Sequence, residues 1–147
     1  EAKMKGKEMM GDNNEFYFLS DSSSRKIYKD KSGIYGLYYE EECFYVGQSK
    51  NLYSRLSSHN RPETRLREIK NKIQREASSD RTPNREKSIK MYEFIRDNSS
   101  LIKFKILKLS TEENLDKYEE EFISLYKPKY NYVGVDVDYW AHSNNKK

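Results

Sequence analysis

Two tyrosines, an arginine and a histidine follow one another at intervals that could bring them into one site. Tyr35 ends the string G-I-Y, Tyr45 begins the string Y-V-G ten residues later, and Arg55 and His59 follow at a spacing of four. Residues four apart share one face of a helix. An arginine fork binds phosphate oxygens, and a phenol or an imidazole can accept or relay a proton. These residue types together could hydrolyse a phosphate ester.

A carboxylate would complete this chemistry. Glu119, Glu120 and Glu121 are consecutive, and helical geometry separates them because each residue advances about 100° around the axis. Glu119 falls within the arc of apolar residues, whereas the other two fall outside it. The arc consists of Leu115, Tyr118, Phe122, Ile123, Leu125 and Tyr126. A carboxylate on a buried face needs a cation, a proton or a hydrogen-bond partner. Glu119 is therefore the candidate metal ligand, with a salt bridge to an arginine as the alternative.

The two tyrosine strings predict a β-hairpin. Residues 33–39 and 43–47 are rich in β-branched and aromatic residues, and three glutamates separate them. A three-residue turn pairs Tyr35 with Gly47 and Leu37 with Tyr45, so that both tyrosines face the same side. A turn of two or four residues would send them to opposite faces unless a β-bulge compensated. Gly47 would leave open space beside Tyr35, where a phosphate could approach.

Helices account for most of the remaining chain. Ser49 is the predicted N-cap of a helix through about Asn60, with Leu52 and Leu56 facing the sheet. Pro62 interrupts this pattern. The elements predicted after it are helices over 63–77 and 84–97, a half-buried strand over 102–108, and a helix that opens with a capping box over 110–113 and ends before Pro128.

The end of the chain supplies a further motif. From Glu119 to Asn131 the sequence reads E-x-x-x-I-x-x-x-x-P-x-Y-N. Together with the tyrosine strings, Arg55 and His59, this motif resembles the GIY-YIG nuclease superfamily over residues 33–131. The resemblance implies a metal-dependent DNA endonuclease that leaves 3′-hydroxyl and 5′-phosphate ends, with one Mg²⁺ or Mn²⁺ ion in each active site.

The resemblance also implies a catalytic role for five residues. Glu119 would hold the metal ion, and Arg55 would clamp the scissile phosphate. Tyr45 would accept the proton of the attacking water, with His59 or Tyr35 as its relay or support.

Three further residues match the superfamily's pattern less directly. Gly47 and Asn131 would support the site. Gln48 stands where many members of the superfamily carry lysine, which puts a charged role there in doubt. Its amide could instead contact a phosphate or a base.

Basic residues are concentrated in the middle of the chain. Residues 49–90 contain twelve Lys or Arg against five Asp or Glu, a net charge of +7, and the rest of the chain sums to −3. Such a block favours a phosphate backbone as the partner, with a solvated helix face as the alternative. The segment of about residues 61–98 is longer than the corresponding part of the minimal module of the superfamily. We therefore predict a basic helical insertion here, which either adds DNA contacts or only stabilises the fold. The predicted DNA-binding residues are Gln48, Lys50, Arg61, Arg65 and Lys72.

The length of 147 residues suits one domain. We predict an α/β fold in which helices flank a small central β-sheet, about three-stranded and mainly antiparallel, with the basic helical insertion. The nuclease domain would cover residues 32–135, between a polar N-terminal tail or arm over 1–31 and a C-terminal tail over 136–147. An aromatic patch at 16–19 could add an edge strand, and residues 1–10 could be native or an artificial extension.

The single cysteine, Cys43, cannot form an internal disulfide, and two histidines cannot build a structural zinc site. Cys43 is therefore expected to be a small buried hydrophobe. An intracellular location is expected, cytoplasmic if the source is bacterial or a phage. No apolar run approaches the length of a membrane span, and no membrane partner is expected.

The branch of the superfamily stays open. A compact restriction enzyme and the catalytic domain of a homing, repair or mobile-element nuclease both fit, because the sequence shows no zinc finger and no obvious helix-turn-helix. The partner would be DNA, most simply duplex, and a homodimer could cut both strands. A catalytically inactive nucleic-acid-binding module of the same fold is the alternative, and a protein-interaction scaffold is a third.

Overall fold

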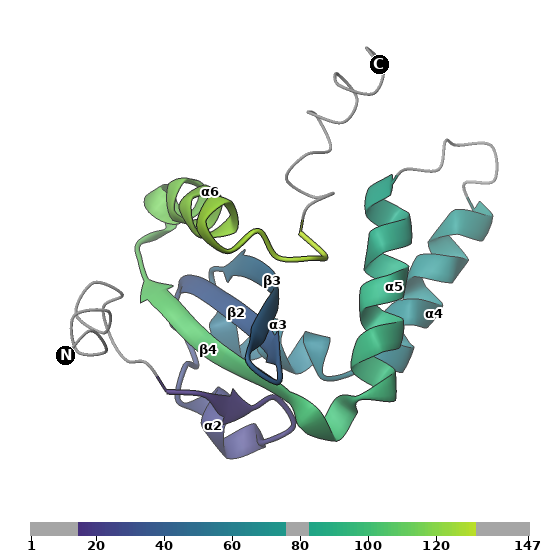
Figure 1. The fold of residues 1–147 in the computed structure, drawn as a ribbon, viewed down its shortest axis with the longest axis horizontal. Coiled ribbons are helices and arrows are strands. Elements are labelled where there is room, and N and C mark those ends of the chain that lie inside the picture. The colour runs from purple at the N-terminus through teal and green to yellow at the C-terminus, as the bar shows by residue number, and fades with distance from the viewer. Residues whose placement is uncertain (1–14, 76–82, 132–147) are drawn as a thin grey trace, which may run out of the picture.

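A small antiparallel β-sheet forms the centre of the protein (Figure 1). The computed structural model describes residues 15–75 and 83–131. The strands, in the spatial order β1-β4-β2-β3, are β1 (Tyr17–Phe18), β2 (Gly33–Tyr39), β3 (Glu42–Ser49) and β4 (Ile102–Leu109). The predicted α/β fold with a small antiparallel sheet is confirmed. The aromatic patch at 16–19 supplies β1, a fourth strand at one edge.

Helices lie on both faces of this sheet (Figure 1). Helix α6 covers one face, and α3 covers the other, with α2 packed against α3 and the pair α4 and α5 standing beside it. The α-helices are α2 (Ser22–Lys26), α3 (Leu52–His59), α4 (Pro62–Arg75), α5 (Pro83–Asp97) and α6 (Leu115–Tyr126). Two 3₁₀ turns, η1 (Ser99–Leu101) and η2 (Glu112–Asn114), flank β4. None of the helices described here is long and apolar enough to cross a membrane.

Each face of the sheet builds its own hydrophobic core. The core under α6 contains Ile34, Tyr38, Cys43, Val46, Leu107, Leu115 and Ile123. The core toward α3 and α5 contains, among others, Tyr35, Leu37, Phe44, Leu52, Leu56, Tyr92, Ile95, Phe104 and Ile106. Along β2 the side chains alternate between these cores, as a pleated strand requires. Cys43 is buried as predicted, and burial raises the pKa of its thiol to about 11.

The hairpin of β2 and β3 reaches its predicted register by a different route. The turn contains two residues, Glu40 and Glu41, rather than three, and Glu40 has a positive φ of 60°. This shift alone would turn Tyr45 to the opposite face. A β-bulge at Phe44 restores the register, so that Leu37 pairs with Tyr45.

A second bulge lies between β2 and β4. Ile34 pairs with Lys108 and Tyr35 pairs with Ile106, which leaves Leu107 as the additional residue. The bulge explains why two consecutive apolar residues are both buried here, since Ile106 faces one core and Leu107 the other.

Two predicted helix caps are wrong. Asn51, not Ser49, caps α3, and its Oδ1 accepts from the Ser54 amide at 3.2 Å, while the Ser49 hydroxyl donates to the Asn51 carbonyl. The capping box over 110–113 does not form, because the Ser110 hydroxyl donates to the carbonyl of Thr111 and η2 precedes α6. Helix α4 begins at Pro62. Proline has no amide hydrogen, and at the first position of a helix that hydrogen would have no intrahelical partner, so proline is tolerated there. Helix α6 ends before Pro128, as predicted.

Part of the predicted N-terminal arm packs as part of the domain. Asp21 caps α2, and Leu19 and Tyr28 are buried in the core toward α3 and α5. The buried Arg25 donates to the Ser57 hydroxyl of α3 at 3.2 Å. The predictions for residues 1–14 and 132–147, which include the C-terminal tail, lie outside the described residues, as does the predicted end of the helix over 63–77.

Candidate active site

Tyr35 and Tyr45 lie on the face of the sheet that α3 covers. The register places Tyr35 opposite Gly47 and Leu37 opposite Tyr45, as predicted. The centroids of the two tyrosine rings are 6.2 Å apart. Tyr35 is completely buried, whereas Tyr45 is half-buried. The hairpin therefore presents two phenols to one side, and solvent reaches one of them.

Gly47 allows the ring of Tyr35 to lie directly over the backbone of β3. A Cβ atom at this position would be 2.4 Å from the Tyr35 hydroxyl oxygen and 2.5 Å from Cζ. The predicted open space beside Tyr35 is therefore wrong. Because the two residues are cross-strand neighbours, the ring of Tyr35 itself fills the space that the missing side chain leaves.

His59, the last residue of α3, hydrogen-bonds through both ring nitrogens. Its Nε2 lies 2.7 Å from the Tyr35 hydroxyl, and its Nδ1 lies 3.0 Å from the hydroxyl of Tyr92 on α5. Its ring centroid is 5.5 Å from those of both Tyr35 and Tyr45, and its ring stacks on Tyr92. At 1% exposure, His59 is part of the protein interior.

Acid should destabilise the protein through His59. Burial above all, and then the charges of Arg55 and Arg65, lower the pKa of this imidazole to about 3, whereas an unfolded histidine titrates near pH 6.5. The unfolded chain therefore takes up the proton first, and stability falls as the pH drops from about 6.5 towards 3. From pH 7 to pH 5 we expect His59 alone to cost about 2 kcal/mol of unfolding free energy. Urea unfolding of the native protein and of His59→Gln at both pH values checks this. An equal pH-dependent loss in both proteins would contradict it.

Arg55 stands one turn before His59 on α3 and interacts with both Tyr35 and Tyr45. Tyr35 makes the largest contribution to raising the pKa of the Arg55 guanidinium. In return, Arg55 lowers the pKa of Tyr35 and of Tyr45, but burial is the stronger effect and leaves the pKa of each phenol raised. The Arg55 side chain is also solvent-accessible, so it can contact a bound substrate and the two phenols together.

Helix α6 directs Glu119 towards the sheet, as its spacing predicts. Glu119 is half-buried, whereas Glu120 and Glu121 are exposed. One member of the predicted apolar arc does not pack, since Leu125 is 67% exposed. Leu125 lies at the edge of that arc, where small departures from ideal geometry decide burial.

Gln48 on β3 holds the Glu119 carboxylate. Its Nε2 donates to Oε1 of Glu119 at 2.9 Å and to Oδ1 of Asp116 at 2.7 Å. Burial raises the pKa of Glu119, and the Gln48 hydrogen bond and the charge of Arg55 act against that rise. The Glu119 carboxylate also raises the pKa of Tyr45. Electrostatic interactions therefore link Glu119 to Arg55 and to one of the tyrosines.

Asn131 hydrogen-bonds the backbone of β3, the strand at the edge of the sheet. Its Oδ1 accepts from the amide of Val46, and its Nδ2 donates to the carbonyl of Val46 at 2.8 Å. The amide of Tyr130 adds a hydrogen bond to the Phe44 carbonyl at 2.9 Å. These bonds satisfy the outer side of the edge strand β3 on either side of Tyr45, which fixes the backbone that carries this tyrosine.

A family model of the GIY-YIG catalytic domain matches residues 31–131. The chain belongs to this family. The match runs from two residues before β2 to Asn131 and includes every residue of the site described above. The protein is accordingly a GIY-YIG nuclease domain, for which the substrate is nucleic acid.

Solved structures similar to this GIY-YIG domain include the N-terminal endonuclease domain of UvrC from Thermotoga maritima. In its magnesium-bound form that domain shares 18% identity with the chain at a TM-score of 0.42, over 74% of this chain and 92% of that one. A point mutant bound to its catalytic divalent cation shares 17% identity at a TM-score of 0.43, over 74% and 90%. No curated protein shows significant similarity to the chain.

The carboxylate of this GIY-YIG domain fits a hard divalent cation. Within residues 15–75 and 83–131, no group of three His, Cys, Asp or Glu residues could hold a metal ion. Glu119, with Asp116 as its neighbour on Gln48, offers few protein ligands, which suits Mg²⁺ because this ion keeps several waters. In the described part of the chain Gln48 hydrogen-bonds only Oε1 of Glu119, so Oε2 is available to a cation.

The residues predicted to bind DNA lie on different elements. Lys50 is exposed after β3 and lies 4.0 Å from Glu112. Arg65 on α4 pairs with Glu68 at 2.6 Å and packs over the ring of Tyr92 at 5.8 Å. Lys72 is exposed on α4. Gln48 on β3 hydrogen-bonds Asp116 and Glu119 of α6.

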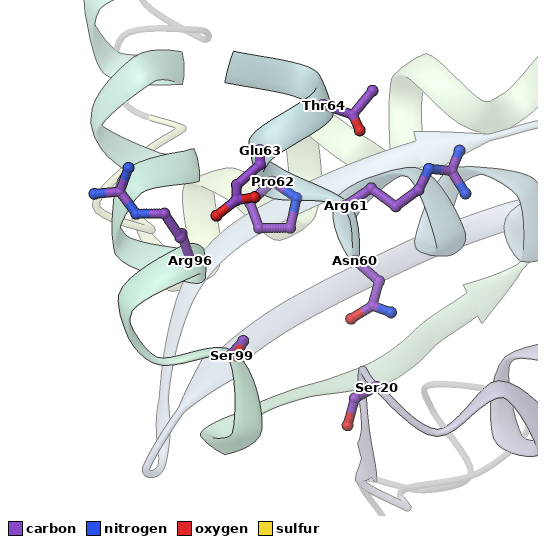
Figure 2. A pocket seen from close by; sticks show the side chains of 8 residues that line it. All are labelled: Ser20, Asn60, Arg61, Pro62, Glu63, Thr64, Arg96 and Ser99. Atoms are coloured by element: carbon purple, nitrogen blue, oxygen red, sulfur yellow. The ribbon is translucent and has the colours of Figure 1, made fainter. Parts of the chain in front are cut away.

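Arg61 lines a pocket at the start of α4 (Figure 2). The other lining residues are Ser20, Asn60, Pro62, Glu63, Thr64, Arg96 and Ser99. Arg61 and Arg96 extend from opposite sides of this pocket. Because Asn60 directly follows His59, the pocket adjoins the end of α3 that carries this histidine.

Two residues of the site escaped sequence reasoning. Tyr92 belongs to the helix predicted over 84–97, and 33 residues separate it from His59, so no local spacing indicates their contact. Asp116 precedes Glu119 by one helical turn, a spacing that could have indicated a shared partner.

Proposed function

We propose that this protein is a metal-dependent DNA endonuclease that hydrolyses phosphodiester bonds by a single-metal, tyrosine-assisted mechanism. The observation that carries the proposal is the cluster at the end of α3, where Arg55, His59 and the two tyrosines meet beside a half-buried carboxylate. A phosphate ester needs positive charge over its oxygens and an acceptor for the proton of the attacking water. This cluster contains residues for both.

Arg55, and a metal ion held by Glu119, would compensate the negative charge of the phosphate. The guanidinium of Arg55 would clamp the scissile phosphate and stabilise the pentavalent transition state. The carboxylate of Glu119 would hold one Mg²⁺ or Mn²⁺ ion, which when bound supplies positive charge to the phosphate and the leaving oxygen. Gln48 would orient that carboxylate through its amide.

Tyr45 is the better placed of the two tyrosines to accept a proton from water. It is half-buried, so a water molecule can reach it, whereas Tyr35 is closed off and bound to His59. Burial raises the pKa of Tyr45, and Arg55 is the residue of this chain that opposes the shift. Tyr35 and His59 would support it, and cleavage would leave 3′-hydroxyl and 5′-phosphate ends.

Cleavage assays on several DNA forms test this function. The chain is incubated with supercoiled plasmid, linear duplex, branched and single-stranded DNA in Mg²⁺, in Mn²⁺ or in EDTA, and the ends of the products are sequenced. We expect metal-dependent cleavage of duplex DNA and 5′-phosphate ends. DNA binding without cleavage of any of these substrates would favour a catalytically inactive binding module instead.

The proposal also covers the type of nuclease, its oligomeric state on DNA and its cellular location. A compact domain of this kind suits a restriction-type enzyme or the catalytic domain of a homing, repair or mobile-element nuclease. Cutting both strands would be simplest for a homodimer on DNA, which light scattering of the complex would detect. An intracellular location stays a prediction.

Basic residues of α4, and Arg61 directly before it, should contribute to DNA affinity without contributing to sequence preference. We expect Lys72→Ala to weaken duplex binding similarly on all sequences and to reduce the slope of log affinity against log salt by about one, because each phosphate contact releases about one counterion. Arg61→Ala should act in the same way. Gel-shift titrations at several salt concentrations measure both. Lys29→Ala, an exposed change outside the basic segment, is the control, and an equal effect there would contradict a specific role for α4.

A further inference from the structure

Helix α6 covers only part of the sheet face on which it lies. It packs on β2 and β3, whereas β1 lies beside the first half of β4, away from α6 (Figure 1). Tyr17 of β1 packs against the core toward α3 and α5. Its neighbours Phe16 and Phe18 therefore point to the other face, where they are 46% and 47% exposed. The uncovered part of this face presents two large aromatic side chains to solvent.

Lysines of β4 lie on the same face as these rings. Phe18 is the cross-strand neighbour of Lys103, whose Nζ lies 5.3 Å from the centroid of the Phe18 ring. Farther along β4, the Nζ of Lys108 lies 4.8 Å from the ring centroid of Tyr118. Residues 99–111 contain three lysines and no acidic residue. In the part of the chain that the structure describes, no ion pair involves Lys103 or Lys108. Both charges are thus available to an anion.

The ring of Phe16 is held in place by buried neighbours. It meets the ring of Tyr38 edge-on, with centroids 4.8 Å apart, and the Nζ of Lys105 lies 4.9 Å from its centroid. Lys105 is only 9% exposed, so it supports the ring rather than presenting its charge to solvent. Because Phe16 is anchored in this way, it loses little side-chain entropy when a ligand stacks on its open side.

We propose that Phe16, Phe18, Lys103 and Lys108, here called the β1–β4 surface, bind a segment of single-stranded DNA. Its bases stack on the two phenylalanine rings, and its phosphates contact the two lysines. This surface lies on the opposite face of the sheet from the two tyrosines of the candidate active site, and outside the basic segment that includes α4. The choice of DNA over RNA rests on the proposed function, whereas the choice of an unpaired strand does not.

An unpaired strand matches this combination of groups better than a duplex does. A single strand exposes the faces of its bases, which stack on aromatic side chains while nearby lysines bind the backbone. In a duplex the bases stack on one another, so only the lysines would contribute, through phosphate contacts. An exposed contact between an ammonium and a ring is weak. Lys103 can therefore exchange Phe18 for a phosphate oxygen and leave the ring to a base. An apolar partner would leave the lysine charges uncompensated.

Fluorescence anisotropy titrations in EDTA test the two rings without cleavage. The ligands are a labelled oligo(dT) strand of about 12 nucleotides and a labelled duplex of mixed sequence. We expect Phe16→Ala and Phe18→Ala each to weaken binding of the single strand about fivefold or more, and to change duplex binding less than about twofold. Ile27→Ala is the matched control, because Ile27 is an apolar residue of similar exposure, 50%, at the end of α2. Unchanged affinity for the single strand, or equal losses for both ligands, would overturn the inference.

Salt dependence tests the lysines of the β1–β4 surface. We expect Lys103→Ala and Lys108→Ala each to reduce the slope of log affinity for oligo(dT) against log salt by about 0.7, the value for one phosphate of a single strand. Lys29→Ala, an exposed change on the other side of the sheet, should leave this slope unchanged. A native slope in both β4 variants would contradict a phosphate contact by these lysines.

Photo-crosslinking of the native protein locates the bound strand without any variant. Oligonucleotides that contain 5-iododeoxyuridine couple to aromatic side chains on which the base stacks, and mass spectrometry identifies the coupled peptide. We expect cross-links in the peptide that contains Phe16 and Phe18. Cross-links confined to other peptides would overturn the inference.

Two further measurements distinguish other occupants of this surface. Tighter binding of oligo(U) than of oligo(dT) would overturn the choice of DNA. Light scattering that shows a dimer of the native chain, and a monomer of Phe18→Ala, would overturn the inference because a second copy would then occupy the surface. The cleavage assays have a separate outcome. A chain that binds single strands through Phe16 and Phe18 but cuts no DNA would refute the proposed catalytic function and leave this inference standing.

Discussion

Glu119→Gln should abolish metal-dependent cleavage while leaving DNA binding intact. Glutamine keeps the shape of the side chain, and its carbonyl oxygen can still accept from Gln48. It removes the negative charge that a divalent cation needs, and metal ions contribute several kcal/mol to such transition states. We therefore expect the rate of plasmid nicking in Mg²⁺ to fall about a thousandfold or more. Gel-shift affinity should be native or slightly higher, because one negative charge near the phosphate is lost.

Neighbouring carboxylates of α6 provide the controls for this change. Glu120→Gln removes the same charge from the same helix at an exposed position, and nicking should stay near the native rate. Asp116→Asn tests the second acceptor of Gln48 and should have an intermediate effect, since Glu119 then keeps its own bond to that amide. Native nicking by Glu119→Gln, or an equal loss in Glu120→Gln, would exclude Glu119 as the metal ligand.

The hairpin shows how far pattern alone could predict the site. Pairing Tyr35 with Gly47 and Leu37 with Tyr45 is correct, although the predicted three-residue turn is not. The burial pattern on the two faces determines the register, and the chain satisfies it with a shorter turn and a bulge at Phe44. A bulge of this kind leaves little trace in the sequence, because consecutive apolar residues occur in ordinary strands as well.

Periodicity predicted the orientation of Glu119 for the same reason, since one face of α6 must pack on the sheet. Capping was predicted poorly. Ser49 and Asn51 both have cap-forming side chains, and the path of the chain after β3 decides between them.

Contacts between distant elements were not accessible from the sequence. The bond of Tyr92 to His59 and the clamp of Asn131 on Val46 join residues 33 and 85 positions apart. No local spacing encodes either contact, although the family motif had already marked Asn131 as a supporting residue. The space beside Gly47 was misread for a related reason. A missing side chain indicates room, but only the packed structure shows that the ring of Tyr35 occupies it.

Gly47→Ala should therefore damage the site from a position with no chemistry of its own. A methyl group would lie 2.4 Å from the Tyr35 hydroxyl oxygen and 2.5 Å from Cζ, closer than unbonded atoms tolerate. The backbone of β3 cannot easily withdraw, because it pairs with β2 on one side and Asn131 holds Val46 on the other. The ring of Tyr35 must turn instead, which breaks its bond to His59.

We expect Gly47→Ala to lower the rate of nicking about a hundredfold, since small misplacements of reacting groups have effects of this size. It should also cost about 1–3 kcal/mol of stability through overpacking. Gly36→Ala is the matched control, because a Cβ there meets Tyr38 at 2.9 Å and Cys43 at 3.3 Å in the core under α6. That change overpacks the opposite face of the sheet and leaves Tyr35 in place. Urea unfolding and nicking rates, measured well below the unfolding transition of either variant, separate the two effects. If both glycine variants lose stability and activity in the same proportion, the close approach of Tyr35 to Gly47 has no specific role in catalysis.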